Sequence, residues 1–141
     1  MTLNELARTA SGTKTPGTTK EELVRRARAL STLLADEARE AEQLRRPTDR
    51  VIQALKDAEI FDLMAPRVYG GLEFDLDTFF EVGVALSEGD ASMAWVANFY
   101  IEHVWIFCLF PREFQEELFG DRRHVLAPAM LSPNGLATRV D

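Results

Sequence analysis

The stretch from Ala91 to Phe110 constrains the fold more than any other part of this 141-residue sequence. It reads ASMAWVANFYIEHVWIFCLF and is apolar almost all the way round, yet it contains Asn98, Glu102 and His103. A helix without a polar face has to be buried among other elements. Because the stretch holds polar residues and lacks basic flanks, we interpret it as a core helix and not as a membrane span.

Four further helices are expected before residue 121. The first is long and amphipathic, because apolar residues recur at spacings of three and four from Leu23 to Ala41, and it ends before Pro47. A short helix from Pro111 to Gly120 follows the apolar stretch. The other helix starts are marked by residues suited to the N-terminal end of a helix, namely Thr19, Thr48, Asp75 or Asp77, and Asp90.

The character of the sequence changes after Gly120. The last segment, HVLAPAMLSPNGLATRVD, has two prolines, an Asn-Gly pair and short apolar runs, which predict strand, turn and strand. A lone hairpin is marginal in water, so we interpret this segment as the incomplete start of a β domain in a longer protein. The expected fold class is mainly α, with a flexible tail at 1–18, a helical domain at 19–120 and the start of a β domain at 121–141.

Composition excludes several classes of function. The net charge of −7 disfavours a nucleic-acid partner, because phosphate binding needs a basic surface. The single cysteine, Cys108, cannot form an internal disulfide, and the sequence has no Cys/His cluster with metal-ligand spacing. The N-terminus has no uninterrupted apolar run of the secretory kind, so we expect a cytoplasmic protein without a membrane anchor.

Three features together resemble the acyl-CoA dehydrogenase superfamily. The first is PRVYGG at residues 66–71, similar to a P-x-x-Y/F-G-G turn of that superfamily. The second is EGDAS at residues 88–92, similar to its junction between the third and fourth helices. The third is the order of elements, in which five helices precede a β segment. The resemblance covers residues 20–141 and implies the N-terminal helical domain of that fold.

Within the superfamily, the sequence is closest to the two-component flavin-dependent monooxygenases, which include hydroxyphenylacetate hydroxylases. The shared pattern is GDASxxW followed eight residues later by histidine, which places Trp95 and His103. The resemblance implies that these two residues border the pocket where reduced flavin, FMN or FAD, meets a phenolic substrate. It also implies flavin contacts near Ala129 and Ser132, a separate flavin reductase and a homo-oligomer.

The spacing supports this site independently of the resemblance. Trp95, Phe99, His103 and Phe107 recur every four residues, so they share one face of the helix. Such a face offers flat walls for a planar substrate and one titratable group, and His103 is the candidate catalytic acid/base. The alternative is that His103 is a core histidine paired with a carbonyl, which is the more common state of a buried polar group.

We therefore expect part of a flavin-dependent monooxygenase that hydroxylates an aromatic or polyketide-like substrate. One alternative is an acyl-CoA dehydrogenase or oxidase, although residues 127–135 lack the T-E-P-x-x-G-S-D stretch of true dehydrogenases. The other is a truncated, non-catalytic helical interaction module. In each case the isolated 141 residues are expected to be inactive and to bind flavin weakly or not at all.

Overall fold

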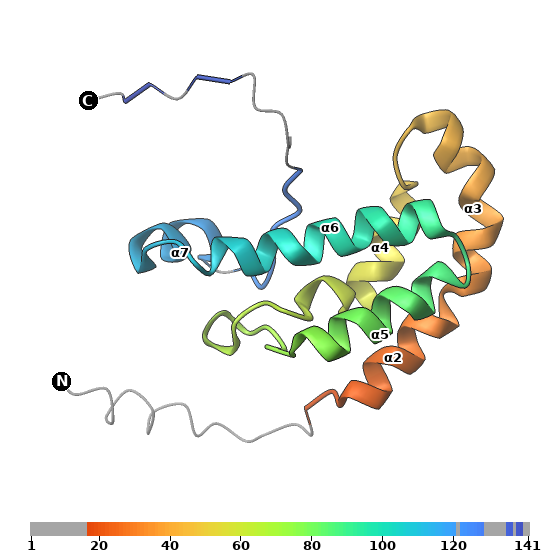
Figure 1. Ribbon diagram of the computed structural model, residues 1–141, viewed down its shortest axis with the longest axis horizontal. Helices are drawn as coiled ribbons and strands as arrows, with labels where there is room; N and C mark the ends of the chain where they lie inside the picture. Colours follow the sequence, from red (N-terminus) through yellow and green to blue (C-terminus); the bar gives the residue numbers. More distant parts are fainter. Residues whose placement is uncertain (1–16, 121, 129–134, 137, 140–141) are drawn as a thin grey trace.

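The structure is a computed structural model that describes residues 17–120, 122–128, 135–136 and 138–139 (Figure 1). The tail expected at residues 1–18 therefore lies almost entirely outside the described residues. Helix α5 packs against both α2 and α6, and these contacts are the most extensive between elements. In chain order the elements are α2 (Lys20–Ala29), α3 (Ser31–Leu44), α4 (Asp49–Asp57), η1 (Ile60–Asp62), η2 (Arg67–Tyr69), α5 (Leu76–Ser87), α6 (Ala91–Phe107) and α7 (Arg112–Phe119).

Local capping chemistry sets the starts of four helices, as the sequence predicts. In each case a side-chain oxygen accepts a hydrogen bond from a backbone N–H three residues later, which satisfies a donor that the helix leaves free. Asp75, and not Asp77, is the cap of α5. The four pairs and their distances are Thr19 with Glu22 (3.2 Å), Thr48 with Val51 (3.3 Å), Asp75 with Thr78 (3.0 Å) and Asp90 with Met93 (2.7 Å).

The prediction of one long helix before Pro47 is wrong, because the chain forms two helices with a break at Leu30. A tertiary contact lies beside this break. The turn between α5 and α6 comes so close to the start of α3 that a Cβ at Gly89 would be 2.3 Å from the carbonyl oxygen of Ser31. The break lets α3 change direction and pack on both α5 and α6.

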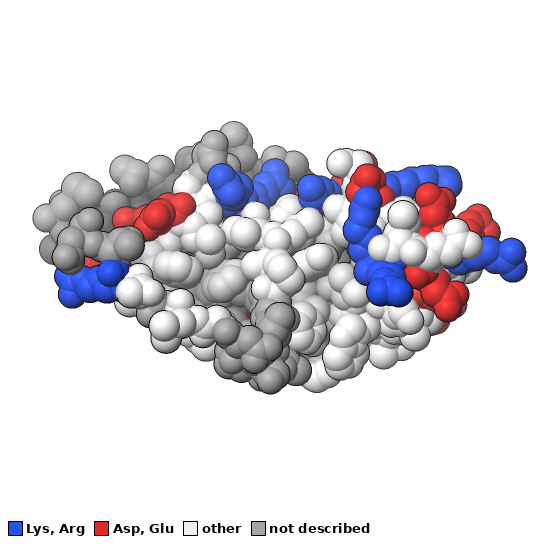
Figure 2. All heavy atoms as spheres, turned by 90° about the horizontal axis from the view of Figure 1, so that it is seen from above, with Lys and Arg blue, Asp and Glu red and all other residues white. Residues whose placement is uncertain are grey.

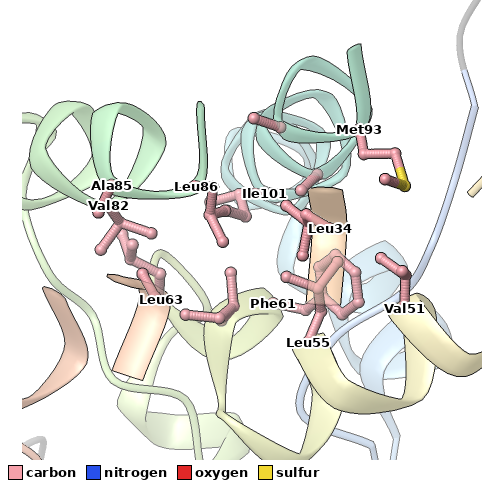
Figure 3. Packing of buried hydrophobic residues seen from close by; sticks show 14 of the residues in the cluster. Leu34, Val51, Leu55, Phe61, Leu63, Val82, Ala85, Leu86, Met93 and Ile101 are labelled. Atoms are coloured by element: carbon pink, nitrogen blue, oxygen red, sulfur yellow. The ribbon is translucent and has the colours of Figure 1, made fainter. Parts of the chain in front are cut away.

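The core forms where α2, α3, α4, η1, α5 and α6 meet, and Figure 3 shows part of it. Phe61 of η1 is fully buried in this cluster, and so are Leu34, Leu86 and Ile101 from three different helices. Burying each such side chain contributes about 1.5–3 kcal/mol, so this cluster is the main source of stability.

Helix α6 is less deeply buried than its composition predicts. One side carries Met93, Ala97 and Ile101 into the core, but Trp95 and Trp105 are 69% and 42% exposed. Figure 2 shows a broad area without charged side chains over the middle of the molecule, with most Lys, Arg, Asp and Glu toward the end where α3 lies. The expectation that other elements cover this helix on every side is therefore wrong for the part of the chain that the structure describes.

The strands expected after Gly120 are not formed by the described residues of this segment. Residues 122–128 run across the helices as irregular chain, and residues 129–134, which include the start of the Asn-Gly turn, lie outside the described residues. A strand needs a neighbouring strand for its backbone hydrogen bonds, and none is present among the described residues. The β domain stays a prediction.

Candidate active site

Four side chains form a continuous aromatic row along α6: Trp95, Phe99, His103 and Phe107. Their ring centroids are separated by 6.1, 4.6 and 6.4 Å in that order. The row follows from the four-residue spacing, because residues i and i+4 lie above one another on a helix. The structure therefore brings together all four residues that the sequence singles out on this helix.

His103 is the buried polar residue of the row, with an exposed fraction of 6%. Its Nδ1 lies 2.6 Å from the carbonyl oxygen of Ala127, which is 24 residues away in the sequence. A carbonyl can only accept a hydrogen bond, so Nδ1 is the donor. In the neutral imidazole this leaves Nε2 as the acceptor nitrogen, the form that a general base requires.

This geometry combines the two interpretations of His103 that the sequence leaves open. The histidine is paired with a backbone carbonyl, as a core histidine would be. The same bond also orients the ring and selects its tautomer, as the hydrogen-bond partners of functional histidines do. A structural hydrogen bond at Nδ1 is therefore compatible with acid/base work at Nε2.

The carbonyl that binds His103 belongs to a segment held by charged contacts. His124 Nδ1 pairs with Asp62, whose side chain is almost fully buried at the end of η1. Arg123 reaches both Asp62, at 3.3 Å, and Glu59, at 3.0 Å. These contacts attach the start of residues 122–128 to the helical core and so position Ala127 beside His103.

Sequence reasoning missed Asp62 and Glu59. In the sequence, Arg123 belongs to a basic pair too small to indicate a site, and its acidic partners are more than 60 residues earlier. Asp62 follows the apolar pair Ile60-Phe61, and a charged residue buried beside such a pair is the one local signal that could have indicated a partner.

Replacing Glu59 by glutamine is expected to lower the free energy of unfolding by about 1–2 kcal/mol at pH 7. Glu59 also pairs with Arg26 at 2.7 Å, and this hydrogen bond is the main reason why the pKa of Glu59 lies below its ordinary value of 4.5. A lowered pKa means that the ion pairs stabilise the fold above about pH 4.5, and that this contribution disappears as the pH falls further. Thermal unfolding at several pH values measures the difference.

The matched control for Glu59 is Glu40→Gln, because Glu40 is an exposed glutamate on α3. Its unfolding temperature should stay within error of the unaltered protein at every pH. A Glu59→Gln deficit that persists unchanged at pH 3 would contradict the electrostatic explanation.

The sequence also predicted flavin contacts at Ala129, Ser132 and Trp95. Ala129 and Ser132 lie outside the described residues. Trp95 is mostly exposed and forms one wall of a groove between α5 and α6. Within the described part of the chain, no cluster of His, Cys, Asp and Glu could hold a metal ion, and no helix is long and apolar enough to cross a membrane.

Comparison with known proteins gives a consistent set of relatives, although no family model matches the chain. The pigment production hydroxylase of Rhodococcus sp. is 34% identical over 123 residues, which cover 87% of this chain and 32% of the relative. The flavin-dependent monooxygenase oxygenase subunit HsaA of Mycobacterium tuberculosis is 33% identical over 108 residues, covering 77% of this chain and 27% of the relative.

Solved structures agree with the sequence matches. A crystal structure of the HsaA monooxygenase from M. tuberculosis superimposes with a TM-score of 0.69 at 32% identity, covering 72% of this chain and 28% of that one. XiaF from Streptomyces sp., solved in complex with FADH2 and glycerol, gives a TM-score of 0.69 at 34% identity over 72% of this chain and 26% of that one. In sequence and fold, this chain is related to part of the oxygenase components of flavin-dependent monooxygenases, which have the acyl-CoA dehydrogenase-like fold.

The family assignment confirms the resemblance seen in the sequence and the expected mainly α fold. The chain spans about a third of the length of its curated relatives. What these relatives do as whole proteins is therefore assigned to this chain only as a proposal.

Proposed function

We propose that this chain is part of the oxygenase component of a two-component monooxygenase that uses reduced flavin and O2 to hydroxylate an aromatic or polyketide-like substrate. The observation that carries the proposal is the hydrogen bond from His103 to Ala127 within the α6 aromatic row. This hydrogen bond leaves Nε2 of His103 as the proton acceptor among apolar aromatic rings. The names of the relatives, a hydroxylase and a monooxygenase oxygenase subunit, support the same class of reaction.

In this proposal His103 is the catalytic acid/base. Its Nε2 accepts the proton of a phenolic hydroxyl, which makes the ring more electron-rich and easier to hydroxylate. Phe99 and Phe107 flank the imidazole at 4.6 and 6.4 Å between ring centroids and help to exclude water. Trp95, Phe99 and Phe107 provide flat walls for the substrate ring.

The residues present fit one wall of a flavin site. The indole of Trp95 is 69% exposed and stacks with Phe99, so a planar ring system has an uncovered aromatic surface to lie against. Bound reduced flavin, as FMN or FAD, would supply the electrons that activate O2. Ala129 and Ser132 are the proposed further flavin contacts, and a separate flavin reductase is the proposed electron source.

The remaining proposals concern the whole protein. We propose that residues 19–120 form a helical domain, that residues 121–141 begin a β domain, and that the enzyme is a cytoplasmic homo-oligomer. The acyl-CoA dehydrogenase or oxidase alternative has less support, because the relatives named above are hydroxylases and monooxygenases. The interaction-module alternative applies to the 141 residues taken alone.

The test compares this chain alone with an enzyme that carries it together with the rest of the family's length. Each is supplied with NADH, a flavin reductase, FMN or FAD, ¹⁸O2 and a simple phenol, and products are analysed by mass spectrometry. We expect ¹⁸O in a hydroxylated product from the longer enzyme, and neither product nor bound flavin with the isolated chain. Reduction of flavin by an acyl-CoA without oxygen insertion would instead support the dehydrogenase alternative.

A further inference from the structure

The groove between α5 and α6 has a size suited to a small molecule. It is open to solvent, has a volume of about 350 Å³ and is lined mainly by Phe79, Phe80 and Gly83 of α5 and by Trp95, Asn98 and Phe99 of α6. Small-molecule pockets measure about 300–1,000 Å³, so this groove lies near the lower end of that range. We call this space the α5–α6 groove.

The walls of the α5–α6 groove are aromatic on both sides. Phe79 and Phe80 meet edge to face with 5.5 Å between ring centroids, and Trp95 stacks with Phe99 on the opposite helix. Phe80 and Trp95 are 64% and 69% exposed. Large aromatic side chains left uncovered around a hollow favour a flat, apolar ligand.

Asn98 supplies a polar contact in this apolar groove. Its Oδ1 is buried without a hydrogen-bond partner, the sole such side-chain atom among the described residues. Buried polar atoms are nearly always paired, and an unpaired one is a candidate contact for a ligand or an ordered water. The last torsion of an asparagine side chain has a broad energy minimum, so a rotation of the amide would direct this oxygen toward a bound molecule.

Gly83 makes room for this amide. A Cβ at position 83 would lie 2.6 Å from Asn98 Nδ2, which is too close for any residue with a side chain unless the amide moves. A glycine in the middle of α5 costs about 0.5–1 kcal/mol relative to alanine. Helix α5 therefore accepts a less stable residue at the position where it faces Asn98.

Charge narrows the ligand class further. Glu102 is the ionisable residue that lines the α5–α6 groove, and its side chain is exposed. A carboxylate at this position disfavours an anionic ligand. The oxygen of Asn98 needs a hydrogen-bond donor, which a neutral hydroxyl group provides.

We propose that the α5–α6 groove binds a neutral aromatic compound and that Asn98 accepts a hydrogen bond from a hydroxyl group on it. Asn98 is then a specificity-determining residue beside the α6 aromatic row. The inference rests on the proposed function in one respect, that the compound is the substrate of the enzyme. The hydroxyl bound by Asn98 is then a different group from the one that His103 deprotonates, because His103 does not line this groove. Its test needs neither flavin nor O2, so it can fail or succeed independently of hydroxylation.

The test is calorimetric titration of this chain with two compounds of nearly the same shape, 2-naphthol and 2-methylnaphthalene. Apolar burial alone favours the methyl compound. We expect the unaltered chain to bind 2-naphthol about 5-fold more tightly, because the hydroxyl gains a hydrogen bond to Asn98. The variant Asn98→Leu keeps a similar volume without the amide, and it should lose or reverse this preference.

Stability measurements separate a ligand contact from a structural role. Asn98→Leu removes an unpaired buried amide, so its unfolding temperature should equal or exceed that of the unaltered chain. Gln43→Leu, on the exposed side of α3, is the matched control and should keep the 2-naphthol preference. The proposal is overturned if the unaltered chain shows no preference for 2-naphthol, if Asn98→Leu retains it, or if Asn98→Leu unfolds at a clearly lower temperature.

Discussion

Replacing His103 by alanine in an enzyme that carries this chain is expected to lower the rate of hydroxylation about 100-fold or more. The reason is the loss of Nε2, the nitrogen that the bond from Nδ1 to Ala127 leaves as proton acceptor. Flavin binding should change little, because the proposed flavin wall is Trp95. The measurements are the turnover of a phenol with reduced flavin supplied and, separately, the dissociation constant of the flavin.

A second variant separates the loss of the basic nitrogen from a folding defect. His103→Asn retains a side-chain N–H that can donate to the Ala127 carbonyl but has no basic nitrogen. It should fold nearly as well as the unaltered enzyme and be as inactive as His103→Ala. The other histidine serves as the contrast, because His124 is held by buried Asp62 and its replacement should lower the unfolding temperature. Unchanged turnover in His103→Asn would return His103 to a purely structural role.

Replacing Gly71 by alanine is expected to lower the free energy of unfolding by about 3 kcal/mol or more. Gly71 ends the PRVYGG turn, where its N–H bonds to Pro66 O at 3.0 Å. A Cβ at this position would lie 2.2 Å from the carbonyl oxygen of Ala65, and that oxygen is backbone, so it cannot turn away. Chemical denaturation followed by circular dichroism measures the loss.

Two other glycines provide graded controls for Gly71→Ala. Gly17→Ala meets nothing within 4 Å and should be neutral. Gly70 has a φ of 85°, so Gly70→Ala should cost about 1–2 kcal/mol from backbone conformation alone. If Gly71→Ala were no worse than Gly70→Ala, the backbone contact with Ala65 would not be the reason for the glycine.

Close backbone contacts explain the glycines in the two motifs, PRVYGG and EGDAS, that resemble the family. The second glycine of the PRVYGG turn is required because two backbone segments touch there. The glycine of EGDAS is required because its backbone touches Ser31 at the start of α3. A Cβ on this glycine would lie 2.3 Å from the Ser31 carbonyl oxygen, which leaves no room for a side chain. These two glycines mark close approaches in the fold and not residues of the candidate site.

Local physics made much of the fold predictable. Thr19, Thr48, Asp75 and Asp90 each start a helix because their side chains satisfy a backbone donor within three residues. The aromatic row was predictable for a similar reason, since a four-residue spacing on one helix determines which side chains are neighbours. Such features depend on residues that are close together in the sequence.

Contacts between distant residues were not predictable in this way. The break at Leu30 lies beside a contact between Ser31 and the distant Gly89, and the exposure of Trp95 depends on which side of α6 the other helices cover. The expected strands lacked a partner strand in the described part of the chain. Each of these outcomes depends on how separate elements pack against one another. The residue pattern within one element does not predict that packing.

His103 shows most clearly which features follow from the sequence and which depend on the tertiary structure. The sequence by itself determined that a histidine stands among aromatic rings on the most apolar helix, because spacing alone places it there. Only the tertiary structure decided which of its nitrogens is the acceptor, because that depends on the carbonyl of Ala127, which the contacts of Arg123 and His124 with Asp62 bring to the helix. A tautomer is selected by the partner of the ring, and this partner is 24 residues away.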